Sequence, residues 1–271
     1  MLRYAERLAL GIALEASAFP KPGNVHRLRN FSDTIYEDFI VAAIISVEPL
    51  YRGIRRGYRL YNTSENFKVL CGDMVYSMVS ISMSISGGGN TCLGSSLMLA
   101  PISVALGYRL AKGDSPRAEL VLSTACELLK RISTAVDTIY FYRAIRRTSP
   151  SYVRKADVVG EWPNVWSKSY RREIVEKNVR LWDVLVFSSS FDIVARDIVE
   201  GYPRVYGLSR YLGERLATHN SWNRAVVEAY LYQLSKDIDT LVVRKKGYET
   251  ALYVKERAEG LLELCTNSII F

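Results

Sequence analysis

The chain has 271 residues, 49% of them hydrophobic, and a formal net charge of +8 at neutral pH. This composition supports a large buried core in one helical domain or two smaller ones. It holds no run of 18 apolar residues and no basic-then-apolar start, so we expect a soluble cytoplasmic protein with no membrane partner. The sequence has only two histidines, which excludes a histidine-rich zinc site, and its four cysteines are scattered, which disfavours a disulfide framework.

The basic excess permits three kinds of partner: nucleic acid, an acidic membrane surface or a polyanionic small molecule. The cations are dispersed in short groups along the chain, namely Arg55-Arg56, Arg146-Arg147, Arg171-Arg172 and Arg244-Lys245-Lys246. Solvated helix faces explain most of this pattern, so a nucleic-acid partner is disfavoured. A single glutamine beside abundant Arg, Glu and Tyr points to a thermophilic source.

The first helix is predicted over residues 2–18, where apolar residues recur at helical spacing, and it stops at Pro20-Lys21-Pro22-Gly23. A residue that precedes proline is pushed into extended geometry, so Lys21 is held on a stiff, non-helical elbow. The elbow could be no more than a rigid helix stop. A helix stop, however, does not need a lysine fixed between two prolines.

Helices are predicted next over 35–58, 64–84 and 92–110, and a glycine-rich octet lies between the last two, Gly87-Gly88-Gly89-Asn90-Thr91-Cys92-Leu93-Gly94. Glycines let a ligand approach bare backbone. Asn90 or Thr91 can cap the following helix, whose free amides and dipole favour an anion such as phosphate. The alternative is a plain turn between antiparallel helices. The octet is neither a Walker loop nor a Rossmann fingerprint.

The second half of the chain also reads as helical, with helices predicted over 117–132, 134–146, 170–200 (kinked near residues 188–190), 208–217, 221–236 and 247–264. Residues 148–168 are irregular, and a loop of this length in a compact domain is usually functional or a lid. No alternation of period two extends beyond a few residues. The sequence therefore predicts an all-α fold, a many-helix bundle forming a single domain over residues 1–271.

Two segments together resemble the triphosphoribosyl-dephospho-coenzyme A synthase family: residues 14–23, ending in Pro-Lys-Pro-Gly, and the glycine octet about 65 residues later. Three further matches run nearly to the end of the chain. Asp33 matches the aspartate of the family's His-x-Asp-Met motif. A second match is to the family's Arg-Gly-Glu…Gly-Phe-Pro segment, at Asp197 with Gly201-Tyr202-Pro203. A third is to the family's late Asp-Thr…Arg-Gly-Gly segment, at Asp239-Thr240…Gly247. The pattern is similar to an archaeal-type branch.

The resemblance implies an all-α enzyme that joins ATP to 3′-dephospho-coenzyme A, or to a related hydroxyl acceptor, with release of adenine. It also implies magnesium held with the triphosphate. Phe31, Cys92 and Leu93 stand where the family has His, His and Lys. These departures leave the acceptor open and keep a non-catalytic nucleotide-binding protein as an alternative. A basic nucleic-acid-binding protein is a weaker one.

In the implied reaction a hydroxyl attacks C1′ of the ATP ribose as adenine departs, through an oxocarbenium-like state that carboxylates support. The matched carboxylates, Asp33, Asp197 and Asp239, are the catalytic candidates, and Asp33 and Asp239 are also the candidate magnesium ligands. The candidate substrate- and phosphate-binding residues are Lys21, Pro22, Gly23, Asn24, Gly87, Gly88, Gly89, Asn90, Thr91, Gly94, Arg196, Arg244 and Lys245.

Structural roles are the alternatives for several of these residues. Asp33 could cap the helix at Ile35, and Asp239 could cap the last helical region. Asp192 and Arg196, one helical turn apart, could form a surface pair. We expect Lys21 to be exposed, so that its replacement by alanine would barely change stability. A homo-oligomer is compatible with the sequence, which does not specify it.

Overall fold

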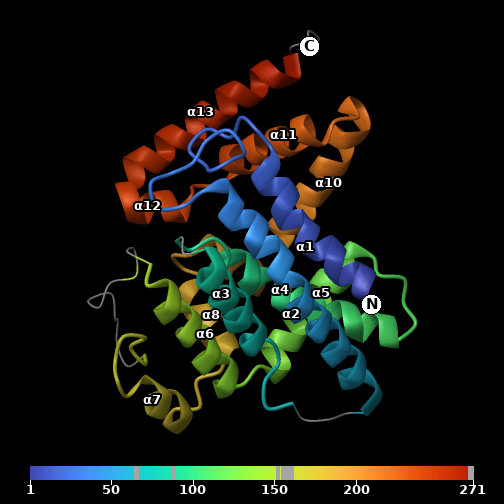
Figure 1. Cartoon of the computed structure of the whole chain (residues 1–271), viewed down its shortest axis with the longest axis vertical. Helices are drawn as coiled ribbons and strands as arrows, with labels where there is room; N and C mark the ends of the chain where they lie inside the picture. Colours follow the sequence, from blue (N-terminus) through green and yellow to red (C-terminus); the bar gives the residue numbers. More distant parts are fainter. Residues whose placement is uncertain (64–66, 87–88, 151–152, 154–161, 268–271) are drawn as a thin grey trace.

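The computed structural model describes the chain except residues 64–66, 87–88, 151–152, 154–161 and 268–271. The described residues form helices and no strand, which confirms the predicted all-α fold (Figure 1). The helices are α1 Leu2–Ser17, α2 Tyr36–Thr63, α3 Gly72–Ser86, α4 Leu93–Ala111, α5 Ala118–Ile132, α6 Ala135–Thr148, α7 Tyr170–Glu176, α8 Leu181–Ser188, α9 Ile193–Val199, α10 Pro203–His219, α11 Trp222–Lys236, α12 Thr240–Lys246 and α13 Tyr248–Asn267.

Helices α2 and α4 cross with their backbones in contact. A Cβ added at Gly57 would lie 1.8 Å from the carbonyl oxygen of Val104, and one added at Gly107 would lie 1.8 Å from that of Ile54. Only glycine fits such an approach. Among the described helices, α4 is the one long and apolar enough, by length and composition alone, to cross a membrane. In this fold it is a packed helix of the core.

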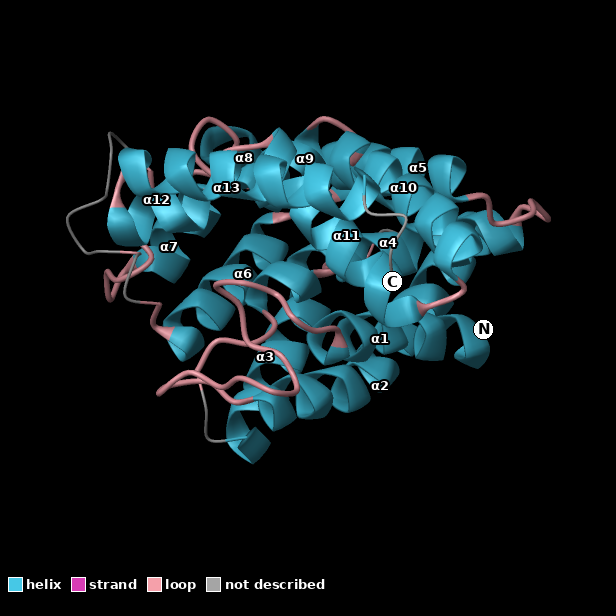
Figure 2. Ribbon diagram, turned by 90° about the horizontal axis from the view of Figure 1, so that it is seen from above, coloured by secondary structure: helices cyan, strands magenta, loops and turns pink. Residues whose placement is uncertain are grey.

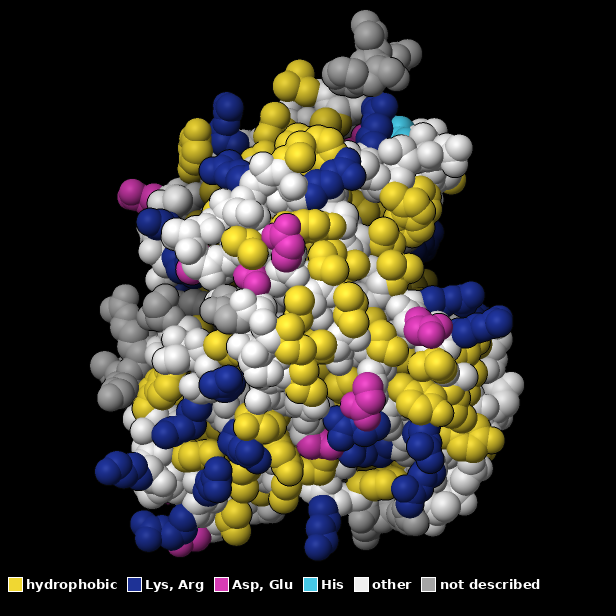
Figure 3. All heavy atoms as spheres, in the orientation of Figure 1, with side chains coloured by type: hydrophobic (Ala, Val, Ile, Leu, Met, Phe, Trp, Pro, Cys, Tyr) yellow, Lys and Arg dark blue, Asp and Glu magenta, His cyan; other side chains and the backbone are white. Residues whose placement is uncertain are grey.

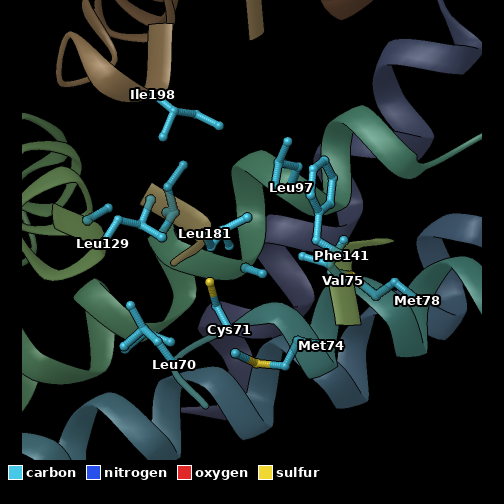
Figure 4. Close-up of a cluster of buried hydrophobic side chains, with 14 of the residues drawn as sticks. Leu70, Cys71, Met74, Val75, Met78, Leu97, Leu129, Phe141, Leu181 and Ile198 are labelled. Carbon is cyan, nitrogen blue, oxygen red and sulfur yellow. The ribbon is translucent and has the colours of Figure 1, made fainter. Parts of the chain in front are cut away.

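The core fills the space between these two helices and α3, α5, α6 and α8. Figure 4 shows its centre, where side chains from separate helices and from the segment before α3 converge, among them Leu70, Met74, Leu97, Leu129 and Leu181. Each of these five is at most 6% exposed. Full burial of such a side chain contributes about 1.5–3 kcal/mol, so this cluster is the main source of stability.

Helix α3 begins at Gly72, although its predicted start was residue 64. The reason is Asp137, whose buried carboxylate accepts hydrogen bonds from the amides of Leu70, Cys71 and Gly72 at 2.7–3.1 Å. The same side chain closes a capping box with Thr134 at the start of α6. One carboxylate thus fixes two helix starts, a long-range contact that periodicity does not reveal.

The predicted long helix over residues 170–200 is wrong, because three short helices occupy this stretch: α7, α8 and α9. Asn178 interrupts the chain after α7 with a left-handed φ of 48°. Asp183 then caps α8 by accepting from the amide of Arg180, and Asp192 caps α9 by accepting from that of Ala195. Polar caps within an apolar stripe therefore outweigh the continuous helical periodicity.

Helices α10 to α13 form a separate layer (Figures 1 and 2), in which α11 contacts α1 and α10 contacts α5 and α9. Helix α10 begins at Pro203, five residues earlier than predicted, and α12 precedes the predicted last helix. Neither α10 nor α12 has a fully buried residue. The buried apolar residues of this layer lie on α11 and α13, among them Leu231 and Ala251. Polar contacts add to this packing, for example the buried Glu228, which accepts from His219 at 2.8 Å and from Arg224 at 3.1 Å.

Of the predicted lid over residues 148–168, residues 151–152 and 154–161 lie outside the described residues. The described residues of this segment are hydrogen-bonded to α6. The Tyr142 hydroxyl donates to the carbonyl of Pro163 at 3.0 Å, and Arg146 donates to that of Val165 at 2.7 Å.

Candidate functional site

Lys21 is a buried cation. Its side chain is 0% exposed, and its Nζ donates to the carbonyl of Glu15 at 2.7 Å and to the Glu15 carboxylate. Nζ also lies 5.9 Å from the centre of the Tyr230 ring. The expectation of an exposed lysine is therefore wrong, because the elbow folds Lys21 back onto the end of α1. A buried ammonium needs such a partner, since burial without one is very costly.

Helix α11 clamps the elbow in place. Asn223 donates to the carbonyl of Phe19 at 2.7 Å and accepts from its amide at 3.0 Å. About two turns further along the same face of α11, the Tyr230 hydroxyl donates to the carbonyl of Pro22 at 2.6 Å. Sequence reasoning missed both residues. Their spacing of seven places them on one face of α11, but nothing local says which segment that face contacts.

Asp33 sits at the mouth of a hollow of about 450 Å³ between the start of α2 and the end of α3. Its carbonyl accepts from the amide of Gly89 at 2.9 Å, and a Cβ on Gly89 would approach that oxygen to 3.0 Å. The Asp33 carboxylate is exposed, and Thr34 donates to it at 3.3 Å. The hollow is lined by Ser32, Asp33, Thr34, Ile35, Asp38, Ser86 and Gly89.

The capping alternative for Asp33 is wrong. The amide of Ile35 donates instead to the buried Asp38 at 3.0 Å, and that of Tyr36 donates to Asn30 at 2.9 Å. The Asp33 carboxylate is therefore not used to begin α2. It remains open to solvent beside Asp38, which lines the same hollow.

The predicted cap of α4 is confirmed for Asn90, whose Oδ1 accepts from the amide of Leu93 at 3.0 Å. Thr91 instead pairs with the Ser82 hydroxyl at 3.3 Å. Gly87 and Gly88 lie outside the described residues. Burial raises the pKa of the Cys92 thiol to about 11, so the residue at the family's histidine position is a neutral side chain at pH 7.

Three other predicted binding residues are part of the backbone turns. Gly23 has a φ of 79°, and Asn24 accepts from the amide of Val25 at 2.9 Å, so both shape the end of the elbow. Gly94, in the first turn of α4, has open space around its Cβ position.

Asp197 has a structural role. It is 2% exposed, and its carboxylate accepts from the amides of Arg204 at 2.7 Å and Val205 at 3.4 Å, which holds the start of α10. Burial raises its pKa, while the two amide donors and the Arg204 guanidinium oppose that rise. We therefore withdraw Asp197 as a catalytic candidate, since its oxygens are occupied and away from solvent.

Asp239 begins α12, as the capping alternative predicted. Its Oδ1 accepts from the amides of Leu241 at 2.7 Å and Val242 at 3.1 Å. Its charge also reaches the elbow. Burial raises the pKa of Tyr230 to about 12, and the carboxylates of Asp239 and Glu15 add to that rise. Tyr230 thus connects the Lys21 elbow with Asp239.

Arg196 and Arg244 line a second hollow, of about 640 Å³, between α9, α12 and α13. Arg196 donates to the carbonyl of Ser189 at 2.8 Å, and Arg244 donates to the carboxylate of Asp192 at 3.0 Å. The surface pair of Asp192 with Arg196 is therefore wrong. Lys245 is exposed on α12 and is not among the residues that line this hollow.

The structure thus brings the matched segments together in two groups. Asp33 and Gly89 meet at the first hollow, whereas the Lys21 elbow contacts Tyr230, whose pKa the Asp239 carboxylate helps to raise. Arg196 and Arg244 lie at the second hollow.

Comparison with known proteins gives a family and a fold. Residues 1–268 match the family described as CitG, ATP:dephospho-CoA triphosphoribosyl transferase. The chain is also similar to a crystal structure from Archaeoglobus fulgidus described as a proposed triphosphoribosyl-dephospho-CoA synthase. That similarity has 22% identity and a TM-score of 0.55, over 80% of this chain and 81% of the other, and shows a shared fold. No curated protein matches the chain. The match over residues 1–268 shows that the chain belongs to the CitG family and is a transferase that moves the triphosphoribosyl group of ATP to dephospho-CoA.

Proposed function

We propose that the hollow beside Asp33 holds the triphosphoribosyl end of ATP during this transfer. The observation that carries the proposal is the hydrogen bond of 2.9 Å from the Gly89 amide to the Asp33 carbonyl. It joins two family-matched segments at one hollow. The Asp33 carboxylate does not cap α2 and is exposed to solvent, so it is the open charged group of this hollow.

The donor set of this hollow fits magnesium. Asp33 and Asp38 both line it, and Mg²⁺ binds proteins through one or two carboxylates plus substrate phosphates. Two carboxylates facing a triphosphate without a cation would repel it. The described residues contain no group of three His, Cys, Asp or Glu side chains able to hold a metal by themselves, in keeping with an ion shared with ATP. When bound, the ion would neutralise the phosphate charge.

The second ligand in this proposal is Asp38, not Asp239, because Asp38 lines the hollow and Asp239 does not. One oxygen of Asp38 accepts from the Ile35 amide, and the other would face the ion. Asp239 is the remaining matched carboxylate, so we assign it the proton of the acceptor hydroxyl. In that step the hydroxyl oxygen bonds to C1′, the bond from C1′ to adenine breaks, and Asp239 accepts the proton.

Lys21 acts in this proposal as a positioning residue. The Glu15 carboxylate compensates most of its charge, and two of its three donor hydrogens are directed to Glu15. Its contribution is to fix the elbow next to Tyr230 and Asp239.

The experiment follows adenine released from ATP, together with the coenzyme product, in the presence of Mg²⁺ and dephospho-CoA. Asp33→Asn keeps size and hydrogen bonding but removes the charge, so the rate should fall at least about 100-fold. The control is Asp114→Asn, at the turn between α4 and α5, where an aspartate pairs with Arg109 far along the chain from the matched segments. A wild-type rate for Asp33→Asn would overturn the assignment of this hollow.

A further inference from the structure

The second hollow has the opposite charge to the first. Of the residues that line it, Arg196, Lys236, Arg244 and Lys255 are cationic, and Asp237 is the one acid. The Asp237 carboxylate is already engaged, because Arg204 donates to it at 3.2 Å and Gln233 at 3.1 Å. The hollow therefore carries a clear positive excess. Its volume of about 640 Å³ is that of a small-molecule site.

The two arginines are held in fixed orientations. Arg196 donates to the carbonyls of Ser189 and Ser190 at 2.8 and 3.1 Å. Arg244 donates to the carbonyl of Phe191 at 3.1 Å and to the Asp192 carboxylate at 3.0 Å. Side chains fixed in this way lose little entropy when they bind an anion.

The two lysines are engaged more weakly. Lys255 pairs with Glu259 at 3.1 Å, one turn along the surface of α13, and Lys236 lies 5.2 Å from the centre of the Tyr232 ring. A surface pair of this kind is worth less than about 1 kcal/mol, so a polyanion can displace it.

Aromatic rings lie beside these cations. Phe191 is 47% exposed and Tyr248 is 60% exposed, and both line the hollow. An exposed ring is a surface on which a nucleobase can stack, worth about 1–3 kcal/mol per base. Cations for phosphate and rings for a base are the recognition chemistry of a nucleotide.

The reaction brings together two polyanions, and the chain offers two hollows of opposite charge. The acidic one suits a phosphate chain that carries its own divalent ion. The basic one suits a diphosphate bound directly by side chains. Ile238 and Thr240, the two neighbours of Asp239 in the sequence, both line the basic hollow.

We propose that the hollow between α9, α12 and α13 binds the adenosine diphosphate end of dephospho-CoA. This inference rests on the proposed function, because it assigns the first hollow to ATP. Arg196 and Arg244 form its rigid part, and Lys236 and Lys255 close on the diphosphate. The charged surface seen from the side of Figure 1 is mixed in the upper layer, so this proposal rests on the local hollow and not on a broad basic face (Figure 3).

The test measures binding rather than turnover. Dephospho-CoA and, separately, Mg-ATP are titrated into the full chain by calorimetry. Lys236→Ala/Lys255→Ala should weaken dephospho-CoA about 10-fold or more and change the Kd of Mg-ATP less than about two-fold. The matched control, Lys112→Ala/Lys130→Ala, removes two exposed lysines, one directly after α4 and one in α5, and should change neither Kd. ADP should compete with dephospho-CoA, whereas phosphopantetheine should not.

Several outcomes would overturn the proposal: an unchanged Kd for dephospho-CoA in the double variant, equal weakening of both ligands, or no dephospho-CoA binding by the wild type with or without Mg-ATP. Thermal unfolding of each variant shows whether its fold is retained. Tyr248→Ala leaves the cations in place and tests the contact with the base independently. It should weaken dephospho-CoA binding about 5-fold. If Asp33→Asn keeps its activity while the lysine variant loses dephospho-CoA, only the proposed function fails.

Discussion

The helices before residue 200 share one large apolar core, whereas those after it bury few apolar residues, which lie on α11 and α13. Helices α2 to α8 surround an apolar cluster, and α2 and α4 touch through glycines. Helices α10 and α12 bury no residue completely, and the later layer is joined to the rest by hydrogen bonds such as those of Asn223 with Phe19. Packing in the core depends on many contacts at once. The seam, by which we mean the hydrogen bonds of Asn223 and Tyr230 with the elbow, depends on a few groups only.

The candidate site uses both regions. Asp33 and Gly89 are fixed at the ends of core helices, but the Lys21 elbow and Asp239 are fixed by α11 and α12. The comparison therefore predicts that changes in the core act first on stability, and changes at the seam act first on activity. Four experiments sharpen or break this distinction.

The largest effect is expected for Asp137→Ala. It removes the acceptor of three buried amides and half of the α6 capping box, so it should lower the free energy of unfolding by about 3–5 kcal/mol. Urea denaturation followed by circular dichroism measures the change. A loss below about 1 kcal/mol would mean that water takes the place of the carboxylate as acceptor of the three amides, and that stability does not depend on Asp137.

The second experiment compares one substitution in the two regions. Gly107→Ala places a methyl group against the Ile54 carbonyl and should cost about 1–3 kcal/mol. Gly213→Ala, in α10, meets nothing within 4 Å and should stabilise the protein by about 0.5–1 kcal/mol. Denaturant midpoints of the two variants give the comparison directly. Shifts of the same sign would contradict the difference between the regions.

The third experiment is aimed at the seam. Asn223→Ala removes both hydrogen bonds to the Phe19 backbone and should cost only about 1–2 kcal/mol. Adenine release should nevertheless fall by at least about 10-fold, because the elbow loses its position. Ser209→Ala, on the exposed side of α10, is the control and should leave both quantities unchanged. Full activity of Asn223→Ala would show that the elbow does not need this clamp.

The smallest effect concerns pH. His26 is buried below the elbow, where burial, Lys21 and Arg29 lower its pKa from the ordinary value of 6.5. The unfolded chain then binds the proton more readily, so stability should fall as pH drops below about 6.5 and toward the folded-state pKa. His26→Gln should flatten this part of the curve, measured by urea denaturation between about pH 5.5 and 7.5. An unchanged slope would assign the titration to another group.

The predictable parts of the structure are those governed by local periodicity. Helices α1, α4, α5, α6 and α11 end within a residue or two of their expected bounds, because apolar spacing and turn residues agree there. The failures have long-range causes. The start of α3 depends on Asp137, far away in the sequence, and the helices after Tyr170 depend on caps at Asp183 and Asp192.

The site divides in the same way. The motifs identified the elbow, Asp33 and the glycine octet, but not how each side chain is used. Periodicity does not say that Lys21 turns inward to Glu15, or that Asp197 faces the start of α10. Asn223 and Tyr230 carry no motif, because their role exists only once two distant segments meet.

The clamp on the elbow also has a consequence for synthesis on the ribosome. Pro22 and its partner Tyr230 are separated by 208 residues. At about 5–20 residues per second, the elbow waits roughly 10–40 s after its own synthesis before its partner is made. The core helices are complete by about residue 200 and can fold before Tyr230 is made, while the elbow still lacks the helix that holds it. The core of a nascent chain can therefore fold before the elbow is in place. We expect substrate binding only after α11 has been made.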